Sequence, residues 1–136
     1  MTKTISIALP VTDLKKSVAF YEALGFTNNQ MFSGKGAAFM VWSEAINVIL
    51  LTHEMWKTRT NRPICPSSHS EVGMMLSMDS RDAVDAANTA AAAHGGTPDI
   101  NPIEDEGSIY GRDFTDPDGH VWGATWMDPA AMATAQ

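Results

Sequence analysis

The chain has 136 residues, of which 44% are hydrophobic and 18% charged, and this composition favours one compact globular domain. The formal net charge of -7 argues against a nucleic-acid-binding protein, which needs a basic surface, and no apolar run approaches the roughly 20 residues of a membrane span. The N-terminus lacks a signal-peptide pattern and Cys65 is the only cysteine, so we expect a cytoplasmic protein without an internal disulfide.

The first half of the chain predicts a strand, a helix and three further strands. Bulky and small residues alternate over 5–11, which is typical of a strand with two unlike faces. An amphipathic helix is expected over 14–24, with Thr12 or Asp13 as its N-cap and Gly25 as its C-terminal stop. The three strands are expected at 30–33, 37–42 and 46–52. Residues 1–52 therefore read as a βαβββ unit.

A polar segment with two prolines and no clear period follows at 53–70, and we predict a long connecting loop. Loops of this length are uncommon inside compact domains and often cover a site. Trp56 lies in this segment, and we expect it to contribute to a lid over a ligand.

The second half repeats the pattern of the first over 71–127. An alternating strand precedes an alanine-rich helix over 81–94, which Asp79 or Ser80 caps and a Gly-Gly pair ends. The remaining elements are an extended segment over 97–103, a strand over 108–114, a last strand from about 120, and a loose tail over 128–136.

The last two strands are joined by the turn Asp116-Pro117-Asp118-Gly119, in which proline presets φ and glycine takes the positive-φ corner. Gly123 lies in the middle of the last strand. A glycine there indicates a close backbone approach, a bulge or a missing side chain.

The two halves form a weak internal repeat with an offset of roughly 65 to 70 residues. We predict an α+β fold in which two βαβββ modules form an open barrel-like cleft, with the helices outside. The small residues of the strands are expected to line this cleft, because pockets favour the mouths of such barrels.

The segments LPVTDLKKSVAFYEALGF and GRDFTDPDGHVWGATWMD, together with the repeat, resemble the vicinal oxygen chelate superfamily. This superfamily includes glyoxalases, extradiol dioxygenases, and fosfomycin and bleomycin resistance proteins. The chain is most similar to short bacterial proteins described as predicted lactoylglutathione lyases. The resemblance implies the glyoxalase/bleomycin resistance/dihydroxybiphenyl dioxygenase fold, a homodimer, and a divalent metal in each cleft.

The family's metal ligands do not carry over to this chain. They fall at Ser6, near Leu50, near Gly73 and at Gly123, where the family commonly has His or carboxylate side chains. A divalent metal needs several such donors. We therefore expect no cofactor at this position.

Small residues at the ligand positions would leave space in the cleft, which favours a ligand pocket because empty cavities are destabilising. Alternatively, methionine and tryptophan side chains such as Met75, Met40 and Trp42 fill the gap. The candidate ligand-binding residues are Ser6, Ala8, Trp42, Leu50, Trp56, Gly73, Met75, Tyr110, Arg112 and Gly123. For Arg112 an exposed ion pair is an equally good interpretation.

A displaced divalent-metal site is the alternative at the ends of the connecting loop, which carry His53, Glu54, His69 and Glu71. An ordinary solvated loop explains the same residues.

Three functions follow from the sequence. The first is a protein that binds a small organic molecule without the usual metal, and the acidic charge would suit a cationic aromatic ligand. The second is a glyoxalase-like isomerase or lyase of the lactoylglutathione lyase type, with a displaced metal or a metal-free acid and base. The third is a protein-interaction module. We expect a small molecule and a second copy of the chain as partners, and neither nucleic acid nor membrane.

Overall fold

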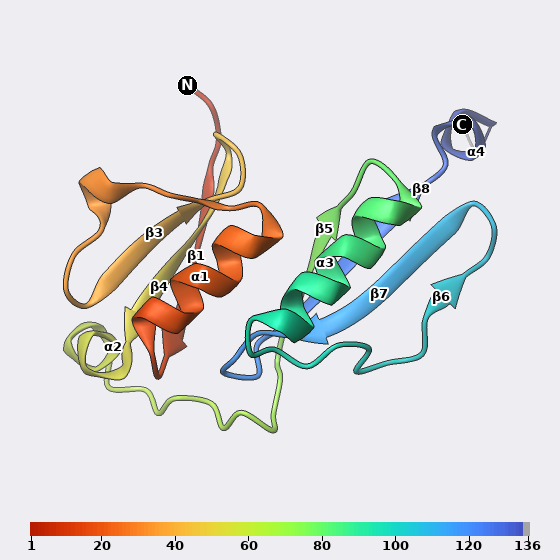
Figure 1. The fold of residues 1–136 in the computed structure, drawn as a ribbon. Helices are drawn as coiled ribbons and strands as arrows, with labels where there is room; N and C mark the ends of the chain where they lie inside the picture. Colours follow the sequence, from red (N-terminus) through yellow and green to blue (C-terminus); the bar gives the residue numbers. More distant parts are fainter. Residues whose placement is uncertain (135–136) are drawn as a thin grey trace. The chain divides into compact units, whose positions relative to one another are not determined.

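A computed structural model describes residues 1–134, with side chains described up to Ala131 (Figure 1). Two compact units make up the chain, one comprising Met1–His69 and the other beginning at Ser70. Each unit contains one four-stranded mixed sheet and its helices, which confirms the predicted α+β class and the two βαβββ modules. No helix within residues 1–134 is long and apolar enough to cross a membrane.

The first unit has the strand order β1-β4-β3-β2, with β1 and β4 parallel and the other pairs antiparallel. Its elements are β1 (Ile5–Val11), α1 (Leu14–Leu24), β2 (Thr27–Asn28), η1 (Gln30–Phe32), β3 (Ala37–Val41), β4 (Ile46–Thr52) and α2 (His53–Arg59). Helix α1 begins where the Asp13 carboxylate accepts a hydrogen bond from the Lys16 amide at 3.0 Å, and it ends at Gly25, whose φ is +113°.

Two predictions for this unit are wrong. Residues 30–33 form a 3-10 turn instead of a strand, because the Asn29 side chain accepts the Met31 amide at 3.1 Å. The predicted loop over 53–70 begins with helix α2, which Thr52 caps by accepting the Met55 amide at 3.1 Å. A helix of seven residues is too short to show a clear apolar period.

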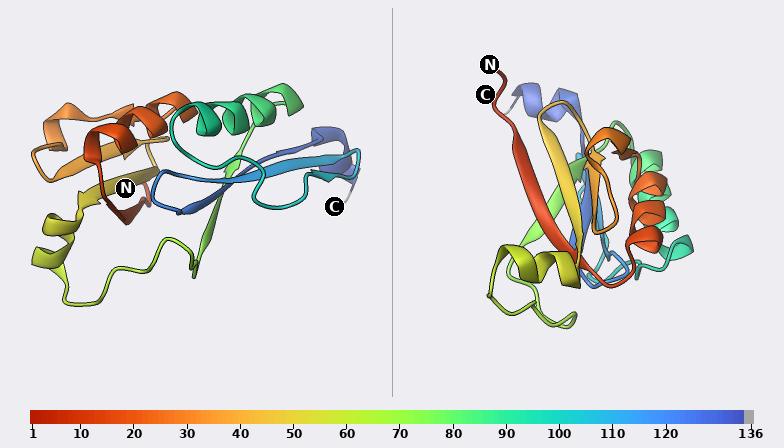
Figure 2. Two further views of the ribbon diagram at one scale, coloured as in Figure 1. Left: turned by 60° about the horizontal axis from the view of Figure 1, so that its bottom comes forward. Right: turned by 90° about the vertical axis from the view of Figure 1, so that its left-hand side faces the viewer.

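The sheet of the first unit has two different faces. Helix α1 covers one face, which we call the helix-covered face, and α2 packs against β1 and β4 on the other side (Figure 2). The helix-covered face holds the core side chains Leu9, Val11, Ala38, Met40, Val48 and Leu50, all at most 6% exposed. Leu50 and Ser6 were both expected to line the cleft, but they lie on opposite faces of the sheet. A shift of one residue along a strand reverses the direction of the side chain.

The second unit has the strand order β5-β8-β7-β6, with β5 and β8 parallel. Its elements are β5 (Gly73–Ser77), α3 (Arg81–Ala93), β6 (Glu104–Asp105), β7 (Ile109–Thr115), β8 (Val121–Met127) and α4 (Pro129–Thr134). Most of the expected segment over 97–103 is irregular, with one bridge between Thr97 and Thr115. The tail begins with α4 instead of a loose cap, and its last residues, 135–136, lie outside the described part of the chain.

The predicted hairpin between β7 and β8 is confirmed. Asp116 is 2% exposed, and its Oδ1 accepts the amides of Asp118 at 2.9 Å and His120 at 2.8 Å. Gly119 adopts a φ of +88°, as the turn requires. The turn sets the register of the two strands, which places Asp113 opposite Gly123.

Replacement of Leu50 by alanine tests the assignment of the faces. We expect Leu50→Ala to lower the free energy of unfolding by about 2 to 5 kcal/mol, because it opens a cavity in the core. The matched change Ile49→Ala, on the half-buried neighbour that faces the other way, should cost roughly 1 to 2 kcal/mol. Chemical denaturation of both variants measures the difference, and a larger loss for Ile49→Ala would contradict the assignment.

Candidate functional site

Opposite α1, helix α2 covers part of the sheet of the first unit, and we call the remaining part of this side the open face. By strand register, Ser6 and Ala8 of β1 share this face with Asn47 and Ile49 of β4. Ser6 and Ala8 are exposed, in accordance with the small face expected from the sequence.

Asn47 is the polar residue on this face that the sequence analysis missed. It is 8% exposed, and its Oδ1 has no hydrogen-bond partner in the described part of the chain. The signal in the sequence is an asparagine inside the otherwise apolar run of 46–51. An unpartnered buried acceptor is rare in folded proteins, so this oxygen is a candidate contact for a ligand.

The open face of the second unit carries the small residues of β5 and β8. Gly73, Met75 and Ser77 are paired in register with Val121, Gly123 and Thr125, respectively, so these side chains lie on one face. Three of the candidate residues, Gly73, Met75 and Gly123, therefore share one face of the sheet. The space in front of the two glycines differs, however.

Gly123 is closed off by two side chains. A Cβ atom placed on Gly123 would lie 2.6 Å from Asp113 Oδ1 and would overlap with the Met75 sulfur. The corresponding atom on Gly73 would meet only Val121 Cγ1, at 3.8 Å. At Gly123 the structure thus agrees with the alternative in which a methionine fills the gap.

Asp113 is a second residue that the sequence analysis missed. Its carboxylate lies beside Gly123, and its Oδ2 accepts a hydrogen bond from Asn101 Nδ2 at 2.9 Å. The chain therefore carries a carboxylate one strand away from the position at which the family's last metal ligand is expected. Counting outward from the hairpin turn would have paired residue 113 with residue 123.

Tyr110 and Arg112, both predicted to line a ligand pocket, instead face helix α3. The Tyr110 hydroxyl donates to Asp85 Oδ1 at 2.6 Å, and Arg112 Nη1 donates to the same oxygen at 2.9 Å. Arg112 also donates from Nε and Nη2 to the two carboxylate oxygens of Asp99, at 2.9 and 2.6 Å. These contacts join α3, β7 and the segment after α3, so the role of both residues is structural.

The electrostatics of this cluster keep Arg112 and the two aspartates charged and the Tyr110 hydroxyl protonated, because the pKa of Tyr110 is raised. The Tyr110 hydroxyl and the Arg112 guanidinium lower the pKa of Asp85, and Arg112 lowers the pKa of Asp99. The two carboxylates in turn raise the pKa of Arg112. Beside the cluster, Arg81 Cζ lies 4.8 Å from the centre of the Tyr110 ring.

The two predicted pocket tryptophans also differ from expectation. Trp42 packs against Phe26, with ring centroids 5.0 Å apart, on the side of the sheet that α1 covers. Trp56 belongs to α2 rather than to a loop, and its Nε1 donates to the Arg62 carbonyl at 3.4 Å. Trp42 is therefore part of the packing around α1, and Trp56 attaches the loop to its helix.

The residues at the family's ligand positions do not fit a divalent metal. Ser6 offers a hydroxyl group, whereas Gly73 and Gly123 have no side chain. In residues 1–134, no group of three or more His, Cys, Asp or Glu side chains is placed to hold a metal ion. No such group is formed at the alternative, displaced metal site either, which was expected at His53, Glu54, His69 and Glu71.

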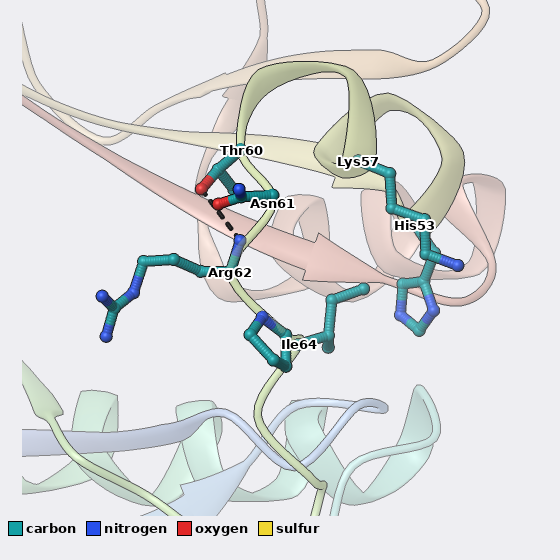
Figure 3. A pocket seen from close by; sticks show the side chains of 7 residues that line it. His53, Lys57, Thr60, Asn61, Arg62 and Ile64 are labelled. Carbon is teal, nitrogen blue, oxygen red and sulfur yellow. Dashed lines mark hydrogen bonds between the residues drawn. The ribbon is translucent and has the colours of Figure 1, made fainter.

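A basic pocket adjoins α2 (Figure 3). Its volume is about 530 Å³, and it is lined by His53, Lys57, Thr60, Asn61, Arg62, Pro63 and Ile64. The pocket was not predicted from the sequence, because the negative net charge of the whole chain hides the basic first half. Residues 1–69 carry seven Lys and Arg against four Asp and Glu, whereas residues 70–136 carry two against twelve. The expectation of a cationic ligand therefore does not suit the basic N-terminal half.

The ion-pair cluster around Arg112 contributes to the stability of the folded protein in a way that depends on pH. Asp85 and Asp99 have folded-state pKa values below the ordinary 3.8, so their contribution is present above about pH 4 and is lost as the pH falls through the lowered values. We expect Arg112→Gln to cost about 1 kcal/mol at pH 7, because water screens carboxylates that are 46% and 35% exposed. The difference from the wild type should shrink below pH 4.

Urea denaturation between pH 7 and pH 3 measures this effect. Arg59→Gln is the matched control, because Arg59 is exposed and forms no ion pair in residues 1–134. A pH-independent cost of Arg112→Gln would contradict the assignment.

The comparison with solved structures supports the fold. A hypothetical protein from S. aureus is 25% identical, with a TM-score of 0.77 over 93% of this chain and 94% of that chain. A glyoxalase/bleomycin resistance protein/dioxygenase family enzyme from Burkholderia phytofirmans is 17% identical, with a TM-score of 0.74 over 90% and 96%. A fosfomycin resistance protein from Listeria monocytogenes is 16% identical, with a TM-score of 0.66 over 93% and 91%.

The comparison with curated proteins gives no match. The family model described as Glyoxalase/Bleomycin resistance protein/Dioxygenase superfamily matches residues 4–123. This range covers both βαβββ units up to the middle of β8. The chain belongs to the glyoxalase/bleomycin resistance protein/dioxygenase superfamily.

Proposed function

We propose that this superfamily member binds a small organic molecule on the open face of the sheet in its first unit, without the divalent metal typical of the family. The observation that carries the proposal is the buried Oδ1 of Asn47, which has no hydrogen-bond partner in the described part of the chain. It lies in register with Ser6, on the face where the side chains of β1 are small and exposed.

Burial of the Asn47 Oδ1 atom without a hydrogen-bond partner has an energetic cost. A buried acceptor without a partner costs about 1 to 3 kcal/mol, and such groups are rare unless a ligand or water satisfies them. An N–H or O–H group of a ligand would remove this cost. The exposed Ser6 and Ala8 leave room beside Asn47, and the half-buried Ile49 offers apolar surface for the body of the ligand.

The second unit has a separate set of candidate groups on its own open face. Gly73 and Ser77 leave space on its open face, Met75 provides an adaptable apolar surface, and Asp113 provides a carboxylate beside Gly123. One carboxylate is too few donors for a tight divalent metal site. It suffices to accept a hydrogen bond from a ligand, so these residues support binding of an organic molecule.

Asp113 also favours one catalytic alternative. A carboxylate on the open face can act as a general acid or base if its proton reaches the substrate. A glyoxalase-like isomerase or lyase would then use Asp113 in place of the family's carboxylate at position 123. We rank this second, because one of the two carboxylate oxygens of Asp113, Oδ2, already accepts the hydrogen bond from Asn101.

Substitution of Asn47 by leucine tests the proposed binding. We expect Asn47→Leu to leave the free protein equally stable or more stable by up to about 1 kcal/mol, because an unpartnered acceptor is removed. A thermal-shift screen of small aromatic and polar compounds should find ligands that stabilise the wild type. The shift should be lost in Asn47→Leu and kept in Thr2→Val, which changes an exposed hydroxyl outside the strand.

Three outcomes would contradict the proposal. One is a screen without any stabilising compound, and another is strong destabilisation by Asn47→Leu, which would show that the amide is satisfied in the folded protein. The third is stoichiometric metal in elemental analysis together with turnover of a methylglyoxal–glutathione adduct. That result would favour the enzymatic alternative.

We further propose that the protein is a homodimer located in the cytoplasm. Symmetric dimers are the commonest oligomers, and outer strands with unpaired edges favour association with a second copy. β1 and β5 are outer strands of their sheets. Sedimentation at micromolar concentration should give twice the mass of the 14.7 kDa chain, and a monomer would reject the dimer.

A further inference from the structure

We propose that the pocket beside α2 binds a small organic anion, with a carboxylate or phosphonate group and an apolar body. We call this pocket the α2 pocket, and it is lined by His53, Lys57, Thr60, Asn61, Arg62, Pro63 and Ile64. The site goes beyond the proposed function, because none of its lining residues belongs to the open faces of the sheets.

The segment that forms the α2 pocket is rich in positively charged side chains. Residues 53–64 contain Lys57, Arg59 and Arg62 against one carboxylate, Glu54, which does not line the pocket, in a chain whose net charge is -7. Arg81 and Arg112 of the second unit are ion-paired with aspartates. In residues 1–134 no ion pair involves a cation of 53–64. These cations therefore remain available to an anionic ligand.

The geometry of α2 brings two of the lining groups together. His53 and Lys57 are four residues apart, so they lie on the same side of the helix. Figure 3 shows the His53 and Lys57 side chains next to each other, whereas the Arg62 side chain points away from them. An anionic group between His53 and Lys57 would contact a hydrogen-bond donor from each, and Arg62 would attract the ligand to the pocket.

The wall of the pocket is held in place by hydrogen bonds that do not use these cations. The Thr60 amide donates to the Trp56 carbonyl at 3.2 Å, and the Arg62 amide donates to Thr60 Oγ1 at 3.2 Å. Trp56 Nε1 donates to the Arg62 carbonyl at 3.4 Å. The loop is thus attached to α2 before any ligand binds, which reduces the entropy lost on binding.

The size and lining of the pocket define the class of ligand. A volume of about 530 Å³ lies within the range of roughly 300 to 1,000 Å³ of small-molecule sites. Pro63 and Ile64 provide apolar contacts, and Asn61 provides an amide that can donate or accept. A small aromatic carboxylate or phosphonate fits this combination better than an inorganic anion, which would leave the apolar lining without contacts.

An NMR titration of the ¹⁵N-labelled full chain tests the proposal. The probes are benzoate, phenylphosphonate, inorganic phosphate and benzylamine. We expect benzoate or phenylphosphonate to shift the amides of 53–64 at millimolar concentration, and binding should weaken as the ionic strength rises from about 20 to about 200 mM. Phosphate should bind more weakly than phenylphosphonate, and benzylamine should not bind.

Charge-matched variants locate the site. Lys57→Gln should weaken binding of the organic anion about fivefold, which corresponds to loss of one partly exposed charge contact. Lys3→Gln makes the same change in net charge outside the pocket and should weaken it less than twofold. Circular dichroism should show that both variants remain folded.

Several results would overturn the proposal. Amide shifts outside 53–64, equal losses for Lys57→Gln and Lys3→Gln, or binding of benzylamine would show that the pocket does not select organic anions. Equal affinity for phosphate and phenylphosphonate would reject the role of Pro63 and Ile64 as apolar contacts.

Discussion

The buried carboxylate of Asp116 is the contact on which the second unit depends. It accepts two backbone amides of the turn and thereby fixes the register of β7 and β8. In that register Asp113 lies beside Gly123 on the open face, whereas Tyr110 and Arg112 point to α3. A register shifted by one residue would exchange these two sets of side chains between the faces. The hairpin turn therefore determines which residues are available to a ligand.

In each unit the two faces of the sheet carry different kinds of side chain. The helix-covered faces hold the apolar core of the first unit and the ion-pair cluster around Arg112 in the second. The open faces carry small side chains, the unpartnered oxygen of Asn47 and the carboxylate of Asp113. Because loss of an open-face side chain removes little core packing, such positions can change while the fold is kept. This arrangement is consistent with a superfamily in which one fold serves several activities.

Features that depend on neighbouring residues could be predicted from the sequence, whereas features that depend on residues distant in the chain could not. The caps of α1 and the turn before β8 were predicted, because capping and turn residues act over a few positions. The direction of Leu50 and of Arg112 depends on pairing with other strands, so alternation alone could not assign their face. The α2 pocket was missed although its cations are visible in the sequence, because the net charge of the whole chain hides the basic first half.

The methionine that covers Gly123 makes the open face of the second unit sensitive to oxidants. Met75 is 65% exposed, and its sulfur lies against the glycine and close to the Asp113 carboxylate. Oxidation to the sulfoxide would convert this flexible apolar side chain into a polar one with an additional oxygen. That oxygen would be repelled by the nearby carboxylate, so the side chain would leave its position over Gly123. The space that Met75 now fills beside Gly123 would then be open.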